Sequence, residues 1–270
     1  MNTESTTGSG CQKQDWPNHK LDCQAQNYIL EVKLCPEDIV DPAVTRTLSC
    51  PAPATFEELH EVLQVAFGWA STHTFDFLIK DPNAAPPREM TFEDYMAKLQ
   101  ASFGQGPAQD PGPRQNFLRI KQYEEEPMGS GVAVDLMHAG LRVHPETPEI
   151  VASKIKLGKV LEQYKGSPIQ YQYDFGDHWD HEITVIGRAA ATDVFICTSG
   201  EGHGVAEDVG GSRAWQDLKA AYRTQRPSKD QKEKMNWFEN QASNSDSYGL
   251  GNGRDRIFDR EGINFRLARM

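Results

Sequence analysis

Apolar residues recur at every second position over 28–34, the period of a half-buried β-strand. A second strand is predicted over 44–50. Thr55 and Glu58 then form a capping box, the apolar positions change to helical spacing, and Gly68 is suited to end the helix in a left-handed conformation. The pattern therefore predicts two strands followed by a helix.

The middle of the chain is less regular. Alternation over 75–79 predicts a third strand, and a helix is predicted to begin at Thr91. The stretches 104–113 and 124–148 are rich in glycine, proline and charged residues and poor in the apolar side chains that a packed core requires. We expect about 80–150 to be a long, partly disordered insertion.

A β-hairpin is the clearest pattern in the second half of the chain. Tyr171 and Tyr173 alternate with polar residues, Gly176-Asp177 gives the turn, and Trp179 and His181 continue the alternation. A strand is expected over 194–197, a helix capped by Ser212, a second helix over 228–241, and a short docking element over 257–267.

Charge and composition restrict the partners. The chain has 270 residues, with 39 acidic against 28 basic side chains and a net charge of −11, and its basic residues form no cluster that would attract a phosphate backbone. Nucleic acid is therefore an unfavoured partner. No stretch has the roughly 18 to 20 apolar residues of a membrane helix, and the first ten residues lack a secretion signal. Five scattered cysteines do not form a disulfide framework, so an intracellular location, cytoplasm or nucleus, is expected.

Cys11, His19 and Cys23 form the first candidate site. Thiolates and imidazole are zinc ligands, and the run Gln-Lys-x-Asp-Trp-Pro-x-His-Lys-x-x-Cys resembles the C-terminal end of a MYND-type zinc finger, a protein-interaction module. The upstream ligands of a full finger are absent. Residues 1–26 are therefore interpreted as a truncated finger or tail, and three ligands without a fourth favour a metal-free remnant over a zinc site.

The hairpin carries the second candidate site. Asp174, Asp177 and His181 place titratable groups around one turn, where they would serve general acid–base chemistry or bind a hard metal ion if they converge. Alternation places His181 at the edge of the core, where Asp174 or Asp177 is expected to orient it and raise its pKa. A buried histidine–aspartate hydrogen bond that only stabilises the hairpin is the competing interpretation.

Glu207 and Asp208 follow a glycine-rich loop and form the third candidate site. The glycines and His203 are suited to shape a pocket wall, whereas the two carboxylates would repel a phosphate and favour a cationic group. In an enzyme, the catalytic set would be Asp174, Asp177, His181, Glu207 and Asp208. The expected pocket residues are His73, Tyr173, Trp179, His203 and Trp215.

The second and third sites together carry a family resemblance. The chain resembles the plasmid pRiA4b ORF-3-like family over nearly all of 27–270, through the motif Asp-Phe-Gly-Asp-x-Trp-x-His-x-Ile followed by Cys-x-x-Gly and Glu-Asp-Val-Gly-Gly. A MYND-like segment ahead of such a domain is typical of fungal members. The chain departs from the family pattern at Val44-Thr45-Arg46, where Trp-Arg-Arg is usual, and at Phe75, where a histidine is usual. The resemblance implies one α+β domain with a mixed or largely antiparallel sheet and no specific activity.

Two functions are consistent with these residues. The first is a binding or adaptor domain that recognises a peptide, a protein or a small cationic or metal-bound ligand at the acidic hairpin. The alternative is a non-redox acid–base enzyme acting on a small molecule, with fungal secondary metabolism as one setting. Dinucleotide, Walker and HExxH motifs are missing from the sequence, so no cofactor is expected beyond zinc at the N-terminal segment.

Overall fold

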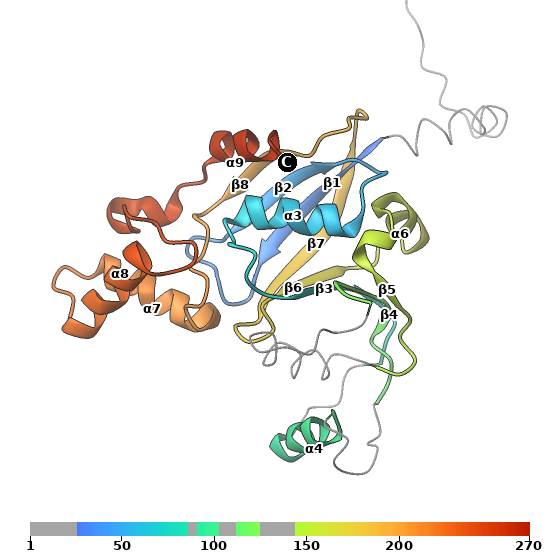
Figure 1. Ribbon diagram of the computed structural model, residues 1–270, viewed down its shortest axis with the longest axis horizontal. Helices are drawn as coiled ribbons and strands as arrows, with labels where there is room; N and C mark the ends of the chain where they lie inside the picture. The colour runs from blue at the N-terminus through green and yellow to red at the C-terminus, as the bar shows by residue number, and fades with distance from the viewer. Residues whose placement is uncertain (1–25, 86–90, 103–111, 125–143) are drawn as a thin grey trace, which may run out of the picture.

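A computed structural model describes residues 26–85, 91–102, 112–124 and 144–270, and it is an α+β fold built on one eight-stranded sheet (Figure 1). The strands are β1 (Asn27–Leu34), β2 (Thr45–Cys50), β3 (Phe75–Lys80), β4 (Asn116–Lys121), β5 (Glu149–Val151), β6 (Ile169–Tyr173), β7 (Trp179–Ala189) and β8 (Ile196–Glu201). Their order is β5-β4-β3-β6-β7-β1-β2-β8. Among the strand pairs of the described residues, β4–β5 is the only parallel one, which confirms the expected mixed, largely antiparallel sheet.

Helices cover one face of this sheet and one end of it (Figure 1). They are α3 (Phe56–Phe67), α4 (Phe92–Ser102), α6 (Leu157–Gln163), α7 (Gly211–Arg223), α8 (Lys229–Asn240) and α9 (Arg260–Leu267), with short 3₁₀ helices η1 (Ala152–Lys154) and η2 (Gly251–Arg256). Helix α3 lies across the sheet, whereas α7, α8 and η2 gather beyond one end of it and α9 packs on β8 (Figure 1).

Helix α3 matches its sequence signals closely. Thr55 Oγ1 accepts a hydrogen bond from the Glu58 backbone N–H, and the Glu58 carboxylate accepts one from the Thr55 backbone, so both halves of the capping box are present. Gly68 ends the helix with φ of 78°. The buried face of α3, with Phe56 and Leu63 among its residues, forms the core against the aromatic side of β3 and β6.

Two expectations about element boundaries need correction. Ser212 was expected to cap α7, but the helix begins at Gly211 behind Gly210, and the Ser212 hydroxyl donates instead to Asp38 Oδ2 at 2.9 Å. The stretch expected to be an insertion contributes β4 and β5 to the main sheet. Its glycine- and proline-rich parts, like residues 1–25, lie largely outside the described residues.

The sheet face opposite α3 is polar where β3 and β4 meet. Asp76 on β3 and Arg119 on β4 are both buried, with Arg119 Nε 2.8 Å from Asp76 Oδ2. Arg119 Nη1 also lies 2.9 Å from Glu149 Oε1 on β5. This ion-paired network joins three strands, and it explains how a strand as charged as β4 can be buried.

Candidate functional site

The turn of the β6–β7 hairpin is held in one conformation by Asp174. Its backbone adopts a left-handed φ of 57°, and its Oδ1 accepts hydrogen bonds from the backbone N–H groups of Gly176 at 2.9 Å and Asp177 at 3.1 Å. The Asp174 N–H donates to Thr74 O just before β3. The second carboxylate oxygen of Asp174 is thereby held in place beside the loop that precedes β3.

Three side chains from separate segments converge at this turn. His73 Nε2 lies 2.8 Å from Asp208 Oδ1 and 3.6 Å from Asp174 Oδ2, and one ligand atom from each residue lies within 4.8 Å of the other two. Asp174 is buried, His73 is partly exposed, and the Asp208 side chain is 46% exposed, so the group is open to solvent on one side. Asp208 also has a left-handed φ, of 63°. Strained backbone in non-glycine residues is concentrated at functional sites in many proteins.

Burial raises the pKa of Asp174, and the nearby Asp177 carboxylate acts in the same direction. His73 and the turn N–H groups act against this rise. A cation placed between the carboxylates of Asp174 and Asp208 would stabilise their charged forms, because it offsets both the desolvation of Asp174 and the repulsion between the two groups. One imidazole nitrogen and two carboxylate oxygens are donors suited to a divalent ion such as Mn²⁺ or Zn²⁺.

Glu207 lies beside Asp208 in sequence but has a different role. It is fully buried, and its carboxylate accepts hydrogen bonds from the Tyr173 hydroxyl, from Thr72 Oγ1 at 3.0 Å and from the Ala70 backbone N–H at 2.7 Å. These bonds fix the loop that carries Asp208 against the loop that carries His73. Glu207 is therefore a positioning residue, away from the solvent-accessible group.

His181 lies in the core, apart from the His73–Asp174–Asp208 group. It is fully buried, its Nδ1–H donates to the Trp179 carbonyl at 2.9 Å, and its ring packs edge-on against Phe67. The expectation that Asp174 or Asp177 orients this imidazole and raises its pKa is wrong, since burial lowers the pKa of His181 to about 3. His181 is thus a neutral core residue.

The other expected pocket residues are divided between the core and a second cavity. Tyr173, Trp179 and Trp215 are buried side chains of the core. His203 lines a cavity beside α9, where its Nε2 lies 3.0 Å from Asp246 Oδ2. Among the expected pocket residues, only His73 joins the hairpin carboxylates. His73 was expected in the pocket but not as a ligand beside Asp174 and Asp208. Its loop is positioned by the Tyr173 hydroxyl, far away in sequence, which accepts hydrogen bonds from the Thr72 and His73 backbone N–H groups.

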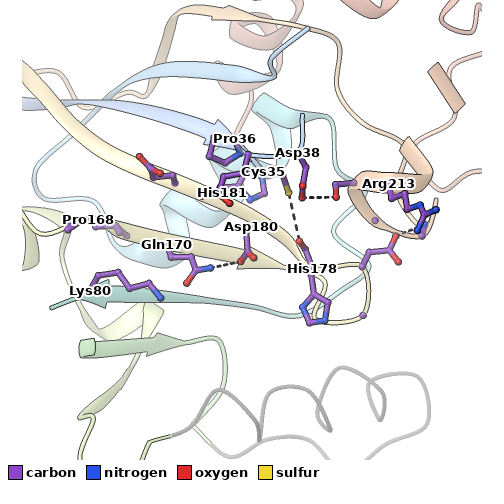
Figure 2. A pocket seen from close by; sticks show the side chains of 18 residues that line it. Cys35, Pro36, Asp38, Lys80, Pro168, Gln170, His178, Asp180, His181 and Arg213 are labelled. Carbon is purple, nitrogen blue, oxygen red and sulfur yellow. Dashed lines mark hydrogen bonds between the residues drawn. The ribbon is translucent and has the colours of Figure 1, made fainter. Parts of the chain in front are cut away.

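A cavity of about 710 Å³ borders the same hairpin (Figure 2). It lies between the hairpin, the segment after β1 and the first residues of α7, and the Ser212–Asp38 hydrogen bond joins two of these walls. Five carboxylates and two basic side chains line it: Glu37, Asp38, Asp177, Asp180 and Glu182, with Lys80 and Arg213. An excess of negative charge in a concave site favours a cationic ligand.

Asp177 connects this cavity to the His73–Asp174–Asp208 group. Its backbone N–H donates to Asp174 Oδ1, and its carboxylate Oδ2 accepts from the Gly210 N–H at 2.9 Å, two residues after Asp208. Asp177 therefore holds the hairpin turn against the Asp208 loop while lining the cavity. The cavity residues on the segment after β1 were not predicted, because only the β1–β7 pairing, with Leu34 opposite His181, places that segment here.

The expected zinc ligands Cys11, His19 and Cys23 lie outside the described residues. The described cysteines, Cys35, Cys50 and Cys197, are buried free thiols. Burial raises the pKa of Cys35 to about 12, and that of Cys197 in the same direction, so neither thiol has the character of a nucleophile.

Comparisons with known proteins place the fold. One relative is the uncharacterized protein y4hQ of Sinorhizobium fredii (strain NBRC 101917 / NGR234), which is 25% identical to this chain over 183 residues. The matched region is 67% of this chain and 66% of that protein, so the chain spans just under two thirds of this relative's length. The crystal structure of MM3350 from Methanosarcina mazei Go1, a protein of unknown function, superposes with a TM-score of 0.54 at 18% identity, over 88% of this chain and 96% of that one. Within the described ranges no helix has the length and apolar character needed to cross a bilayer.

The family model for the plasmid pRiA4b ORF-3-like protein matches residues 26–261, a range that contains the hairpin, the Glu207-Asp208 loop and all eight strands. On this match the chain belongs to the plasmid pRiA4b ORF-3-like protein family.

Proposed function

We propose that this protein is a binding domain that holds a divalent metal ion at His73, Asp174 and Asp208 and uses it to bind a small molecule or peptide at the hairpin. The observation that carries the proposal is the convergence of three ligand atoms, from three separate segments, within 4.8 Å of one another. Two ligands of one ion, each about 2.1 Å from it, lie up to about 4.2 Å apart, so movements of a few tenths of an ångström would close the set.

The support for each ligand favours this proposal. Asp174 is fixed by the turn hydrogen bonds, and Asp208 is held by Ser243 Oγ, 3.0 Å from its second oxygen, and by the buried Glu207 next to it. Oriented ligands with hydrogen-bonded carboxylates are typical of metal sites. Three protein ligands leave coordination positions for atoms of a bound molecule, and the adjoining acidic cavity would favour a molecule with a cationic group.

The alternative, a non-redox acid–base enzyme, depends on His181, which borders the hairpin cavity but is fully buried, with its pKa lowered by that burial to about 3. An enzyme at this hairpin would have to use His73 instead, which lies 2.8 Å from Asp208. The binding domain is therefore the better-supported function.

Isothermal titration of the full-length protein with Mn²⁺ tests the proposal, because Mn²⁺ prefers oxygen and imidazole ligands over the thiolates of Cys11 and Cys23. We expect saturable binding of one ion, weakened at least about tenfold in His73→Gln and in Asp208→Asn. Asp193→Asn, at an exposed carboxylate outside the site, is the matched control and should bind as the wild type does.

The proposed site is refuted if Mn²⁺ binds saturably and neither His73→Gln nor Asp208→Asn weakens the binding, because the ion would then lie elsewhere. The absence of binding with Mn²⁺, Mg²⁺ and Zn²⁺ alike would refute the metal. The N-terminal segment is tested separately: stoichiometric zinc in the purified protein that is lost on Cys23→Ala would establish a zinc site there, against the metal-free remnant favoured by its incomplete ligand set.

A further inference from the structure

A second cavity, of about 390 Å³, lies beside β2, the end of α3, the glycine-rich loop after β8 and helix α9. Among the residues that the structure describes, it shares no lining residue with the hairpin cavity, and none of the proposed metal ligands lines it. Gly204 lines it at a place where only glycine fits, because a Cβ there would lie 2.3 Å from the Phe67 carbonyl oxygen. The loop is thereby held close against α3.

The guanidinium of Arg46 is buried in the wall of this cavity. Its side chain is only 2% exposed, and its Nε donates to Ala66 O at 2.7 Å while Nη1 donates to Thr45 O and Glu201 O at 2.6 and 2.7 Å. Nη2 makes no hydrogen bond within the described ranges, and no carboxylate there lies within 4.0 Å of Arg46. The charge is therefore buried without a counter-ion.

Aromatic rings cover the guanidinium. Its central carbon lies 5.1 Å from the centre of the Phe67 ring and 5.0 Å from that of Phe258. These cation–π contacts and the three carbonyls compensate part of the cost of desolvation, but a buried charge is stabilised most by an opposite charge. Burial lowers the pKa of Arg46 to about 10, and the group is still charged at neutral pH. The Nη2 edge is the part of Arg46 that remains available to a ligand.

The remaining charges around the cavity leave an excess of positive charge. Arg254 and His203 both contact the carboxylate of Asp246, with Arg254 Nη2 at 2.8 Å from it. Asp259 caps helix α9 by accepting from the Gly262 N–H. Arg266 lies exposed at the cavity, where it adds a second cationic group.

Apolar side chains supply about half of the cavity wall. Phe67, Val205, Phe238 and Ile263 line the cavity and belong to the hydrophobic core. An apolar part of the wall next to one buried cationic group matches an amphipathic anion, since the apolar side chains bury its hydrocarbon part while the guanidinium binds its charge. A single free edge of the guanidinium suits one carboxylate better than a doubly charged phosphate.

We propose that this cavity binds a small organic monocarboxylate, with its carboxylate on Arg46 and its apolar part against Phe67 and Phe238. The volume is within the range of small-molecule sites and admits an aromatic or short aliphatic acid. The site is independent of the proposed metal site, because the two share no residue.

Titration of the full-length protein with benzoate, phenylacetate and hexanoate tests this proposal, with benzamide as the uncharged counterpart of benzoate and inorganic phosphate as an anion without an apolar part. We expect saturable binding of at least one of the three acids, with weaker binding of benzamide and phosphate by tenfold or more. Arg46→Met should abolish that binding, and Arg266→Gln, at an exposed position that does not endanger folding, should weaken it severalfold.

Arg213→Gln changes an arginine of the hairpin cavity and is the matched control, which should bind as the wild type does. The proposal is overturned if none of the three acids shows saturable binding, if phosphate binds more tightly than all three, or if a folded Arg46→Met binds the acid as tightly as the wild type. If Arg46→Met fails to fold, the Arg266→Gln comparison and the benzoate–benzamide difference decide the question.

Discussion

Acid should destabilise this protein through His181, and the effect can be isolated by His181→Leu. In an unfolded chain a histidine has a pKa near 6.5, whereas burial lowers the pKa of folded His181 to about 3. Between these values the unfolded state binds one more proton than the folded state, so stability falls as the pH falls below about 6.5. The buried Arg46 guanidinium acts in the same direction on His181, and the other titratable group against the ring is Tyr171.

The magnitude follows from the linkage relation. One proton is worth about 1.36 kcal/mol per pH unit, so two units below the unfolded pKa, at about pH 4.5, the His181 proton costs about 2.7 kcal/mol of unfolding free energy. His181→Leu removes this contribution and also removes Nε2, a buried ring nitrogen with no hydrogen-bond partner within the described ranges. At pH 7 the variant should therefore lie within about 2 kcal/mol of the wild type.

Urea unfolding followed by tryptophan fluorescence at about pH 7 and about pH 4.5 measures the difference. Carboxylates and the buried His60 titrate in both proteins and cancel, so the wild type should lose about 2.7 kcal/mol more than His181→Leu between the two pH values. Gln64→Leu changes a buried polar residue of α3 that carries no titratable proton, and it should shift stability equally at both pH values. Equal losses in wild type and His181→Leu would show that the imidazole is not buried as a neutral group.

Three further substitutions examine the framework around the sites. Tyr173→Phe leaves the buried Glu207 carboxylate without one donor and should lower the unfolding free energy by about 1.5–3 kcal/mol in urea unfolding; a change below about 0.5 kcal/mol would contradict the buried hydrogen bond. Arg119→Met removes the buried ion-pair partner 2.8 Å from Asp76 and should cost about 3–5 kcal/mol, and a second change, Asp76→Leu, should recover part of that loss; unchanged stability in the single variant would argue against the buried pair. Thr55→Ala removes the α3 cap and should cost about 1 kcal/mol, measured by thermal unfolding, with Thr55→Ser as the variant that retains the wild-type value.

Local signals in the sequence were enough to predict the elements that obey local rules. The capping box at Thr55 begins α3, the helix expected over 228–241 is α8, and the Gly176-Asp177 turn joins β6 to β7, because each depends on residues a few positions apart. Strand β4 was missed, since its Arg119 becomes a buried residue only through Asp76 on the neighbouring strand β3, which lies 43 positions earlier in the sequence. Burial of that kind depends on tertiary pairing and leaves no period in the sequence.

The candidate site was predicted in part for the same reason. Alternation correctly predicted that His181 lies on the core side of its strand. It does not predict how deeply the side chain is buried, so the direction of its pKa shift was wrong. Asp174 and Asp208 were expected to contribute to one site, and they do lie together. Their partner His73 is positioned by the Tyr173 hydroxyl, which accepts hydrogen bonds from the Thr72 and His73 backbone N–H groups across 101 and 100 positions of the sequence.

The segment between β3 and β4, residues 81–115, affects how this chain tolerates changes of length. The Asp81 N–H donates to Gln115 O at 3.0 Å, so the chain leaves the sheet and returns to it at neighbouring positions, and α4 stands apart from the sheet between them (Figure 1). Closing a longer or shorter loop over a fixed gap changes its entropy only by a logarithmic amount, about 0.6 kcal/mol for each doubling. We therefore expect the junction at Asp81 and Gln115 to be where the native segment can be replaced by a short linker or an inserted reporter domain at the lowest cost in stability.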